Sequence, residues 1–111
     1  MTTCEPGDVV LVRFPFTDLT STKKRPAIVI SPQSYSQRYG DIVLIPLTSQ
    51  NQNEPTLALK EWRAAGLPKP TWIKPLIGTL SLSLVERKLG SIDPRDRICV
   101  QTAIRTIIKF D

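Results

Sequence analysis

The chain has 111 residues, the size of one domain, and we expect residues 1–111 to form a single domain. Fifteen Lys and Arg side chains against ten Asp and Glu give a net charge of +5, which favours an anionic partner such as nucleic acid or an acidic protein. The chain has no histidine, so Ser–His and Cys–His nucleophile pairs are excluded. No apolar run approaches the roughly 20 residues that span a bilayer, and we expect a cytoplasmic protein without membrane contact.

Short apolar and β-branched runs predict several short strands, and ten prolines fit frequent strand ends better than long helices. The run at 9–14 is the first expected strand, and Pro15 ends it. A polar loop follows over 16–24. Pro26 then starts a second strand, because a missing amide hydrogen is tolerated at the first residue of a strand.

The middle of the chain predicts a third strand over 41–48, preceded by a turn or short helix over 33–38 that stops at Gly40. A Gln/Asn-rich loop follows over 49–55. The remaining pieces are a short strand at 56–60, one helical turn at 61–66, strand-like pieces at 69–75 and 76–80, and an extended or turn segment at 84–92.

The last segment has the clearest helical pattern. Asp93 is a good N-cap and Pro94 suits the first helical position. An apolar stripe at helical spacing predicts the buried face, and we interpret the basic face opposite as solvated surface. The stripe contains Val100, Ile104, Ile107 and Ile108, and the basic face contains Arg95, Arg105 and Lys109. Several strands and one terminal helix predict a mainly β (α+β) fold, a small barrel or curled sheet with the helix packed against it.

Neither a metal site nor a cofactor site is expected. The ten acidic residues are dispersed, and no DxD, HxH or CxxC pattern occurs. No glycine-rich phosphate loop is present either. Cys4 and Cys99 lie at opposite ends of the chain, and nothing in the sequence supports a disulfide between them.

The remaining option is phosphodiester chemistry without histidine, centred on Arg25 and Thr48. Both stand at the ends of expected strands. RNA carries its own nucleophile in the 2′-hydroxyl, so positioning and charge stabilisation supply much of the catalysis. A guanidinium can clamp two phosphate oxygens, and a threonine hydroxyl can donate to a third. Taken alone, an arginine before a strand is more often a surface residue, so this pair is only a hint.

The sequence resembles the MazF/PemK family of toxin endoribonucleases from bacterial toxin–antitoxin systems. The stretches that carry the resemblance are 7–12, 14–19, 24–31, 46–50, 66–71 and 87–90. The resemblance implies an SH3-like curled β-barrel with a C-terminal helix, like the MazF and CcdB toxins. It also implies a homodimer that cleaves single-stranded RNA, mRNA included, at short motifs without a metal, so that translation and growth are inhibited.

The resemblance also implies the site and the partners. Arg25 and Thr48 match the catalytic arginine and threonine of the family, and the loop over 15–24 matches a mobile loop that covers the RNA. A cognate antitoxin with an acidic tail is expected to occupy the RNA groove, in agreement with the net charge of +5. We assign RNA binding to Lys23, Lys24, Phe16, Thr17, Ser49 and Gln50, and we expect Arg13, Arg87 and Lys88 to add positive charge nearby.

Two alternatives remain open. One is a non-catalytic protein of the same fold that binds a protein target such as a topoisomerase. The other is a barrel that binds RNA without cleaving it, which would need exposed aromatic side chains for stacking; Trp72 is expected in the core instead. Gly78 departs from the family pattern, where a larger residue is usual, and this bears on specificity and dimer contacts.

Overall fold

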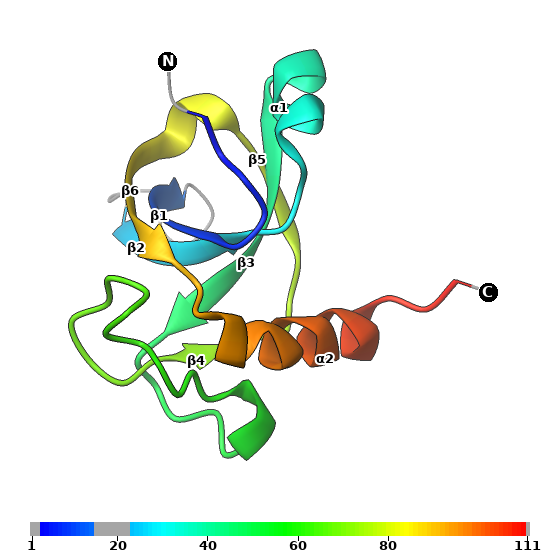
Figure 1. Cartoon of the computed structure of the whole chain (residues 1–111). Helices are drawn as coiled ribbons and strands as arrows, with labels where there is room; N and C mark the ends of the chain where they lie inside the picture. The colour runs from blue at the N-terminus through cyan, green and yellow to red at the C-terminus, as the bar shows by residue number, and fades with distance from the viewer. Residues whose placement is uncertain (1–2, 15–22, 111) are drawn as a thin grey trace.

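The structure is a computed structural model that describes residues 3–14 and 23–110. Its centre is a curled antiparallel sheet in the order β4-β3-β2-β1-β6, with β5 also paired to β3 (Figure 1). The strands are β1 (Asp8–Phe14), β2 (Lys23–Val29), β3 (Asp41–Thr48), β4 (Trp72–Ile73), β5 (Gly78–Ser81) and β6 (Val85–Ser91). The helices are α1 (Gln33–Tyr39) and α2 (Arg97–Ile107), with 3₁₀ turns η1 (Pro55–Leu57), η2 (Leu82–Leu84) and η3 (Pro94–Asp96).

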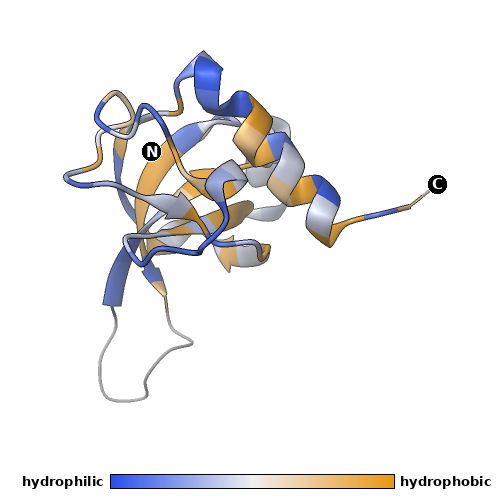
Figure 2. Ribbon diagram, turned by 90° about the horizontal axis from the view of Figure 1, so that it is seen from below, coloured by the Kyte–Doolittle hydropathy of each residue, from blue (hydrophilic) through white to orange (hydrophobic). Residues whose placement is uncertain are grey.

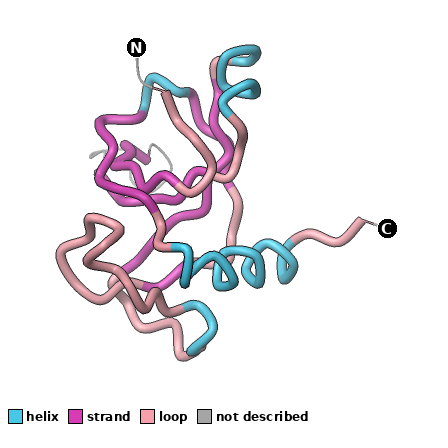
Figure 3. The backbone as a smooth tube through the Cα atoms, in the orientation of Figure 1, coloured by secondary structure: helices cyan, strands magenta, loops and turns pink. Residues whose placement is uncertain are grey.

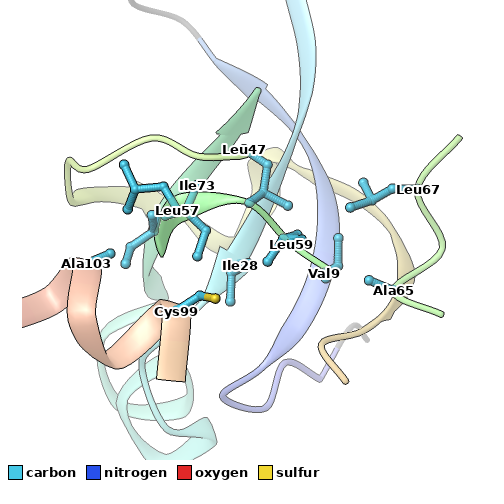
Figure 4. Packing of buried hydrophobic residues seen from close by; sticks show 11 residues of the cluster. Val9, Ile28, Leu47, Leu57, Leu59, Ala65, Leu67, Ile73, Cys99 and Ala103 are labelled. Atoms are coloured by element: carbon cyan, nitrogen blue, oxygen red, sulfur yellow. The ribbon is translucent and has the colours of Figure 1, made fainter. Parts of the chain in front are cut away.

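The three central strands are buried on both faces because each places alternate residues into two separate apolar clusters. In β1, Val9 joins one cluster, whereas Val10 and Val12 join the other. The second cluster fills the space enclosed by the curled sheet, with Cys4 and Leu80 among its members. The first cluster is covered by segment 57–73 and α2 (Figure 4), with buried contributions from Leu57, Leu59, Ala65, Leu67, Ile73, Cys99 and Ala103.

The expected mainly β fold with a C-terminal helix is confirmed, and Figure 3 shows the strands gathered together, with a long loop region between β3 and β4. One expected boundary is wrong. β2 begins at Lys23 rather than at Pro26, because it pairs with β1 as far as Phe14. Pro26 is tolerated inside the strand because the ladder with β3 starts only at Ala27, so the missing amide hydrogen is not needed there.

The strand expected at 56–60 is also wrong. Pro55 opens the 3₁₀ turn η1, and the Glu54 carboxylate accepts a hydrogen bond from the backbone N–H of Thr56. Only Ala58 makes an isolated bridge, to Trp72. Leu57 and Leu59 nevertheless point into the core, as the alternation of the sequence predicts.

The terminal helix begins as expected. Asp93 accepts a hydrogen bond from the backbone N–H of Arg95 and caps η3, which continues into α2. The expected stripe is only half right: Val100 and Ile104 pack against the core, whereas Ile107 is 38% exposed and Ile108 53% exposed. Figure 2 shows the mixed hydropathy of this helix and of the tail beyond it. None of the described helices is long and apolar enough to cross a membrane.

Two contacts hold the long segment 58–71 against the sheet. The carboxylate of Asp96 is fully buried and accepts hydrogen bonds from the backbone N–H groups of Lys60, at 3.0 Å, and Glu61, at 2.9 Å. The turn at Gly66 packs directly against the backbone of β6 at Gly90. An added Cβ on Gly66 would overlap the Leu89 carbonyl, and one on Gly90 would overlap the Ala65 carbonyl. These contacts fix the segment that forms one wall of the site described next.

Candidate functional site

A cavity of about 680 Å³ opens where the ends of β2 and β3 meet β6 and segment 66–71. Its lining is partly apolar and partly polar and basic. The apolar lining consists of Leu11, Pro26, Leu47, Leu67, Pro68 and Leu89. The polar lining consists of Arg25, Thr48, Ser49, Gln50, Gln52, Lys69, Thr71, Lys74 and Arg87, and Gly66 completes it.

Arg25 and Thr48 both line this cavity, and the register of the sheet explains why. β2 and β3 pair Ala27 with Pro46 and Ile28 with Ile45. Continued two residues past the Ala27–Pro46 pair, the same antiparallel register brings Arg25 opposite Thr48. Side chains at opposed positions lie on the same face of a sheet. The two residues that the sequence singles out therefore face the same space.

The guanidinium of Arg25 has an unused hydrogen-bond donor. Its Nε is buried, and within the described part of the chain it has no hydrogen-bond partner. A buried polar atom without a partner is costly, by about 1–3 kcal/mol, and more for charged groups. Arg25 also lines the cavity, and a guanidinium matches phosphate oxygens well. The covered Nε can donate to a ligand there only after the side chain shifts to expose it.

Thr48 is oriented by the loop that follows it. The backbone N–H of Gln50 donates to Thr48 Oγ1 at 3.1 Å. Because this bond uses the oxygen as an acceptor, the single hydroxyl hydrogen of Thr48 remains available to donate. The side chain of Gln52 in turn donates to the carbonyl of Gln50 at 3.0 Å, which supports the same loop.

The charges around the cavity all have one sign. Four cationic side chains line it, those of Arg25, Lys69, Lys74 and Arg87, and none of the described residues in the lining is acidic. A cleft with charges of one sign concentrates the field and attracts ions of the opposite sign. This arrangement suits an anionic ligand with several negative charges.

The structure brings together some of the residues that the sequence assigns to binding. Ser49 and Gln50 line the cavity, whereas Lys23 and Lys24 are exposed on β2 and are absent from its lining. Lys24 Nζ instead lies 3.9 Å from a carboxylate oxygen of Glu86. Phe16 and Thr17 lie outside the described residues.

Of the additional basic residues expected near the site, one lines the cavity and two form ion pairs outside it. Arg87 lines the cavity, opposite Leu11 in the β1–β6 pair. Arg13 pairs with Glu86 at 3.0 Å, and Lys88 pairs with the buried Asp8 at 3.1 Å. Alternation along β6 separates Arg87 from Lys88, because neighbouring residues of a strand point to opposite faces.

Lys69 and Lys74 are lining residues that the sequence reasoning did not assign to binding. Long-range backbone contacts place them there: Lys74 N–H donates to the Pro46 carbonyl at 3.0 Å, and Leu59 N–H donates to the Thr71 carbonyl at 3.0 Å. The stretch 66–71, which carries part of the family resemblance, was the available signal. No charge run marks either lysine.

Other kinds of chemistry have little support among the described residues. No group of three or more His, Cys, Asp or Glu side chains lies close enough together there to hold a metal ion. Cys4 and Cys99 are buried free thiols. Burial raises the pKa of both thiols, and the nearby carboxylates of Asp8 and Asp96 raise the pKa of Cys4 and Cys99, respectively, further. Both thiols are therefore poor nucleophiles near neutral pH.

Comparison with known proteins gives a family and a fold. Residues 5–108 match the model of a PemK-like, MazF-like toxin of type II toxin–antitoxin systems. The comparison with curated proteins finds no match. Among solved structures, MazE–MazF of Deinococcus radiodurans (form III) is similar at a TM-score of 0.75 and 18% identity, over 96% of this chain and 97% of that chain.

Two mycobacterial structures are similar as well. An endoribonuclease in complex with its cognate antitoxin from a mycobacterial species has a TM-score of 0.71 and 20% identity, over 96% of this chain and 93% of that one. The Mycobacterium tuberculosis toxin MazF-mt6 has a TM-score of 0.72 and 14% identity, over 89% and 93%. At such identities the likeness establishes a shared fold.

Proposed function

Because the chain belongs to the PemK-like, MazF-like toxin family of type II toxin–antitoxin systems, we propose that it is an endoribonuclease that cleaves single-stranded RNA, mRNA included. The observation that carries the proposal is the pair of Arg25 and Thr48 at one cavity whose lining holds four cations and, among the described residues, no acid. The cavity fits a phosphodiester better than a neutral or cationic ligand.

In the proposed reaction the substrate supplies its own nucleophile. The 2′-oxygen forms a bond to the adjacent phosphorus, and the bond from phosphorus to the 5′-oxygen breaks. The 2′-hydroxyl loses its proton, and the departing 5′-oxygen gains one. The products are a 2′,3′-cyclic phosphate and a 5′-hydroxyl end.

The two side chains have separate tasks in this reaction. The pKa of an arginine stays above about 12, so Arg25 is no general base and instead stabilises the negative charge that develops on the phosphoryl oxygens. The position of Arg25 in the cavity lining supports this role. Thr48 donates its hydroxyl hydrogen to a phosphoryl oxygen or to the departing 5′-oxygen.

The proposed partners follow from the same charge. An acidic segment of a cognate antitoxin competes with RNA for the cationic lining and inhibits the enzyme. A similar structure is that of a mycobacterial endoribonuclease in complex with its cognate antitoxin. We also propose that the toxin acts as a homodimer, that it needs no cofactor and that RNA cleavage inhibits translation and growth.

The test is an incubation of the purified protein with a long single-stranded RNA in excess EDTA, followed by mapping of both new ends. Cleavage at short motifs with 5′-hydroxyl ends is expected, and the Arg25→Ala protein should give none. Activity that is lost in EDTA and restored by Mg²⁺ would contradict the mechanism. RNA that is bound but stays intact would favour the RNA-binding alternative.

A further inference from the structure

Trp72 lies next to the cationic cavity, on a surface where the sequence does not predict it. The expectation was a core position, but the side chain is only partly buried and lines a second hollow of about 380 Å³. We call this the Trp72 hollow; it is lined by Asn51, Asn53, Glu54, Pro55 and Trp72. A large aromatic side chain in a surface hollow can stack against a planar ring of a ligand.

The sheet register places the Trp72 hollow beside the proposed reaction centre. β3 and β4 pair Thr48 directly with Trp72. Opposed residues in an antiparallel pair have Cβ atoms about 4.5–5.5 Å apart and point to the same face. A ligand that reaches Thr48 in the cavity is therefore within one nucleotide of the indole ring, because the backbone of a nucleic acid advances by several ångströms per nucleotide.

The loop after Thr48 divides its side chains between the two sites. Gln50 and Gln52 line the cationic cavity, whereas Asn51 and Asn53 line the Trp72 hollow. Asn51 accepts a hydrogen bond from the backbone N–H of Asn53 at 2.8 Å, and Asn53 has a left-handed φ of 56°. The loop thus presents amide groups to both sites.

The chemistry of the Trp72 hollow differs from that of the cavity. None of its described lining residues is basic, and the Glu54 carboxylate makes it unfavourable for a phosphate. An indole ring, a proline and two amides instead suit a nucleobase. The face of a nucleobase stacks on the aromatic ring, and the edge of the base carries the donors and acceptors that Asn and Glu side chains recognise.

We propose that the Trp72 hollow binds one unpaired nucleobase of the RNA strand whose scissile phosphate lies at Arg25 and Thr48. This inference rests on the proposed function and adds the subsite that reads a base next to the cut. Stacking by Trp72 supplies affinity, and the amides of Asn51 and Asn53 with the Glu54 carboxylate supply the preference for one base over another.

A binding experiment tests the stacking directly. Trp62 and Trp72 are the two tryptophans of the chain, and Trp62 packs against the core with the Arg63 guanidinium 4.4 Å from its ring centroid. The Trp62→Phe protein therefore reports on Trp72 alone. We would titrate it with four 2′-O-methyl RNA octamers, each of a single base, that cannot be cleaved through a 2′-hydroxyl.

The expected result is quenching of Trp72 fluorescence by at least one octamer. In parallel, Trp72→Ala should weaken the binding of that octamer about 5- to 150-fold, the usual effect of losing one stacked base. Trp72→Phe should retain most of the affinity, and Trp62→Phe should match the unsubstituted protein. If octamers bind by anisotropy but none of the four changes Trp72 fluorescence, the subsite is overturned and the proposed function stays intact.

Cleavage mapping gives an independent readout. On one long RNA, Trp72→Ala should relax the base preference at a single position beside the cut and raise KM more than it lowers kcat. Trp72→Phe should restore both. An unchanged cleavage motif in a folded Trp72→Ala protein would contradict the proposal. If octamers quench Trp72 fluorescence but the protein cleaves no RNA, the proposed endoribonuclease function is contradicted and the base-binding proposal is still supported.

Discussion

Arg25 illustrates what one residue contributes when its strand runs along a cavity. Its backbone pairs with Val12 of β1, which fixes the side chain against the end of the sheet. Its buried Nε has no partner within the described part of the chain. A guanidinium positioned by its strand can stabilise charge in a reaction, and the preorganisation of such groups is the main source of electrostatic catalysis.

The first prediction concerns substitutions of Arg25. Arg25→Ala should lower kcat for RNA cleavage about 100-fold or more, in the range found when a preorganised donor is removed. Arg25→Lys should recover little of this, because an ammonium group cannot reproduce the planar fork of a guanidinium. Single-turnover cleavage of a long RNA measures both effects.

Lys24→Ala is the matched control, since Lys24 precedes Arg25 on the same strand but lies by Glu86 instead of in the cavity. Its kcat should stay within about threefold of the unsubstituted protein, as expected for an exposed charge. Equal losses in both proteins would mean that the overall charge of β2, not the guanidinium, controls the rate.

From the residues alone Arg25 and Thr48 are only a hint, and the family resemblance is what singles them out. The structure brings the two residues to one cavity. Their catalytic roles stay predictions. Lys69 and Lys74 could not be assigned in the same way. Their positions depend on backbone bonds between distant segments, such as the one from Lys74 to Pro46, which no local pattern encodes.

At the scale of elements, the 3₁₀ turn η3 anchors a remote loop. Asp96 is fully buried, and its two carboxylate oxygens accept the backbone N–H groups of Lys60 and Glu61. Those residues begin the segment that supplies Leu67 and Lys69 to the cavity. The helix start and the cavity wall are thus connected through one side chain.

The second prediction follows from this anchor. Asp96→Ala leaves two backbone donors without their acceptor and should lower the free energy of unfolding by about 3 kcal/mol or more, because hydrogen bonds to charged groups contribute about 1.5–3 kcal/mol each. Asp96→Asn keeps one acceptor and should lose less. Urea unfolding followed by circular dichroism measures the difference.

Asp93 provides the comparison for Asp96, because it caps η3 at the surface. Asp93→Ala should cost only about 1 kcal/mol, the usual value for an N-cap. The hydrogen bond from the Arg95 side chain lowers the pKa of Asp93, so the contribution of this cap is present above the ordinary pKa of an aspartate and is lost as the pH falls below it. A loss in Asp93→Ala as large as that in Asp96→Ala would show that the burial of Asp96 is unimportant.

The third prediction contrasts two glycines. A Cβ on Gly66 would lie 2.1 Å from the carbonyl oxygen of Leu89, and Gly66 has a φ of +84°. Gly66→Ala should therefore destabilise the protein by more than about 1–3 kcal/mol, the usual range for forced overpacking. Gly78 has nothing within 4 Å of such a Cβ, so Gly78→Ala should be neutral or stabilising by up to about 1 kcal/mol.

Thermal unfolding of the two proteins measures this contrast, and a Gly66→Ala protein as stable as Gly78→Ala would contradict the tight crossing at β6. The sequence marks Gly78 as a departure from the family pattern, yet it has open space around it in β5. Gly66 has the stronger steric requirement. Glycines are easy to recognise in a sequence, but their neighbours across a fold are not.

Strands with a strong local sequence pattern could be predicted from the sequence, whereas strands that form only by pairing with a distant segment could not. β1 and β3 appear where apolar runs predict them. β4 contains only Trp72 and Ile73, and it exists because both residues pair with the end of β3. A two-residue strand has no periodicity of its own, so the position of Trp72 beside Thr48 could not be read from the sequence.

For the whole molecule, the arrangement of charge matters more than the net value of +5. Several basic side chains outside the cavity are matched by acids: Arg13 and Lys24 approach Glu86, and Lys88 pairs with Asp8. The cavity lining, in contrast, has four cations and no acid among the described residues. The positive potential is therefore expected to be strongest where the substrate is proposed to bind.

The last prediction compares two double substitutions that change the net charge equally. The Lys69→Glu, Lys74→Glu protein alters the cavity, and the Lys23→Glu, Lys24→Glu protein alters the exposed part of β2. Both proteins would be titrated with a non-cleavable single-stranded RNA and with an acidic antitoxin peptide at several salt concentrations. The run of positive charges at the start of β2 predicts that the β2 substitutions weaken both ligands together, whereas the cavity lining predicts the larger loss for Lys69 and Lys74.

The salt dependence separates a local effect from a general one. Each phosphate contact on single-stranded RNA contributes about −0.7 to the slope of log affinity against log salt. Loss of two cavity contacts should therefore make the slope less steep by about 1.4, while the β2 substitutions should mainly lower the affinity through long-range repulsion, which salt screens within about 10 Å. If the β2 protein shows the larger change in slope, RNA and antitoxin bind across Lys23 and Lys24, and the cavity is not the main binding surface.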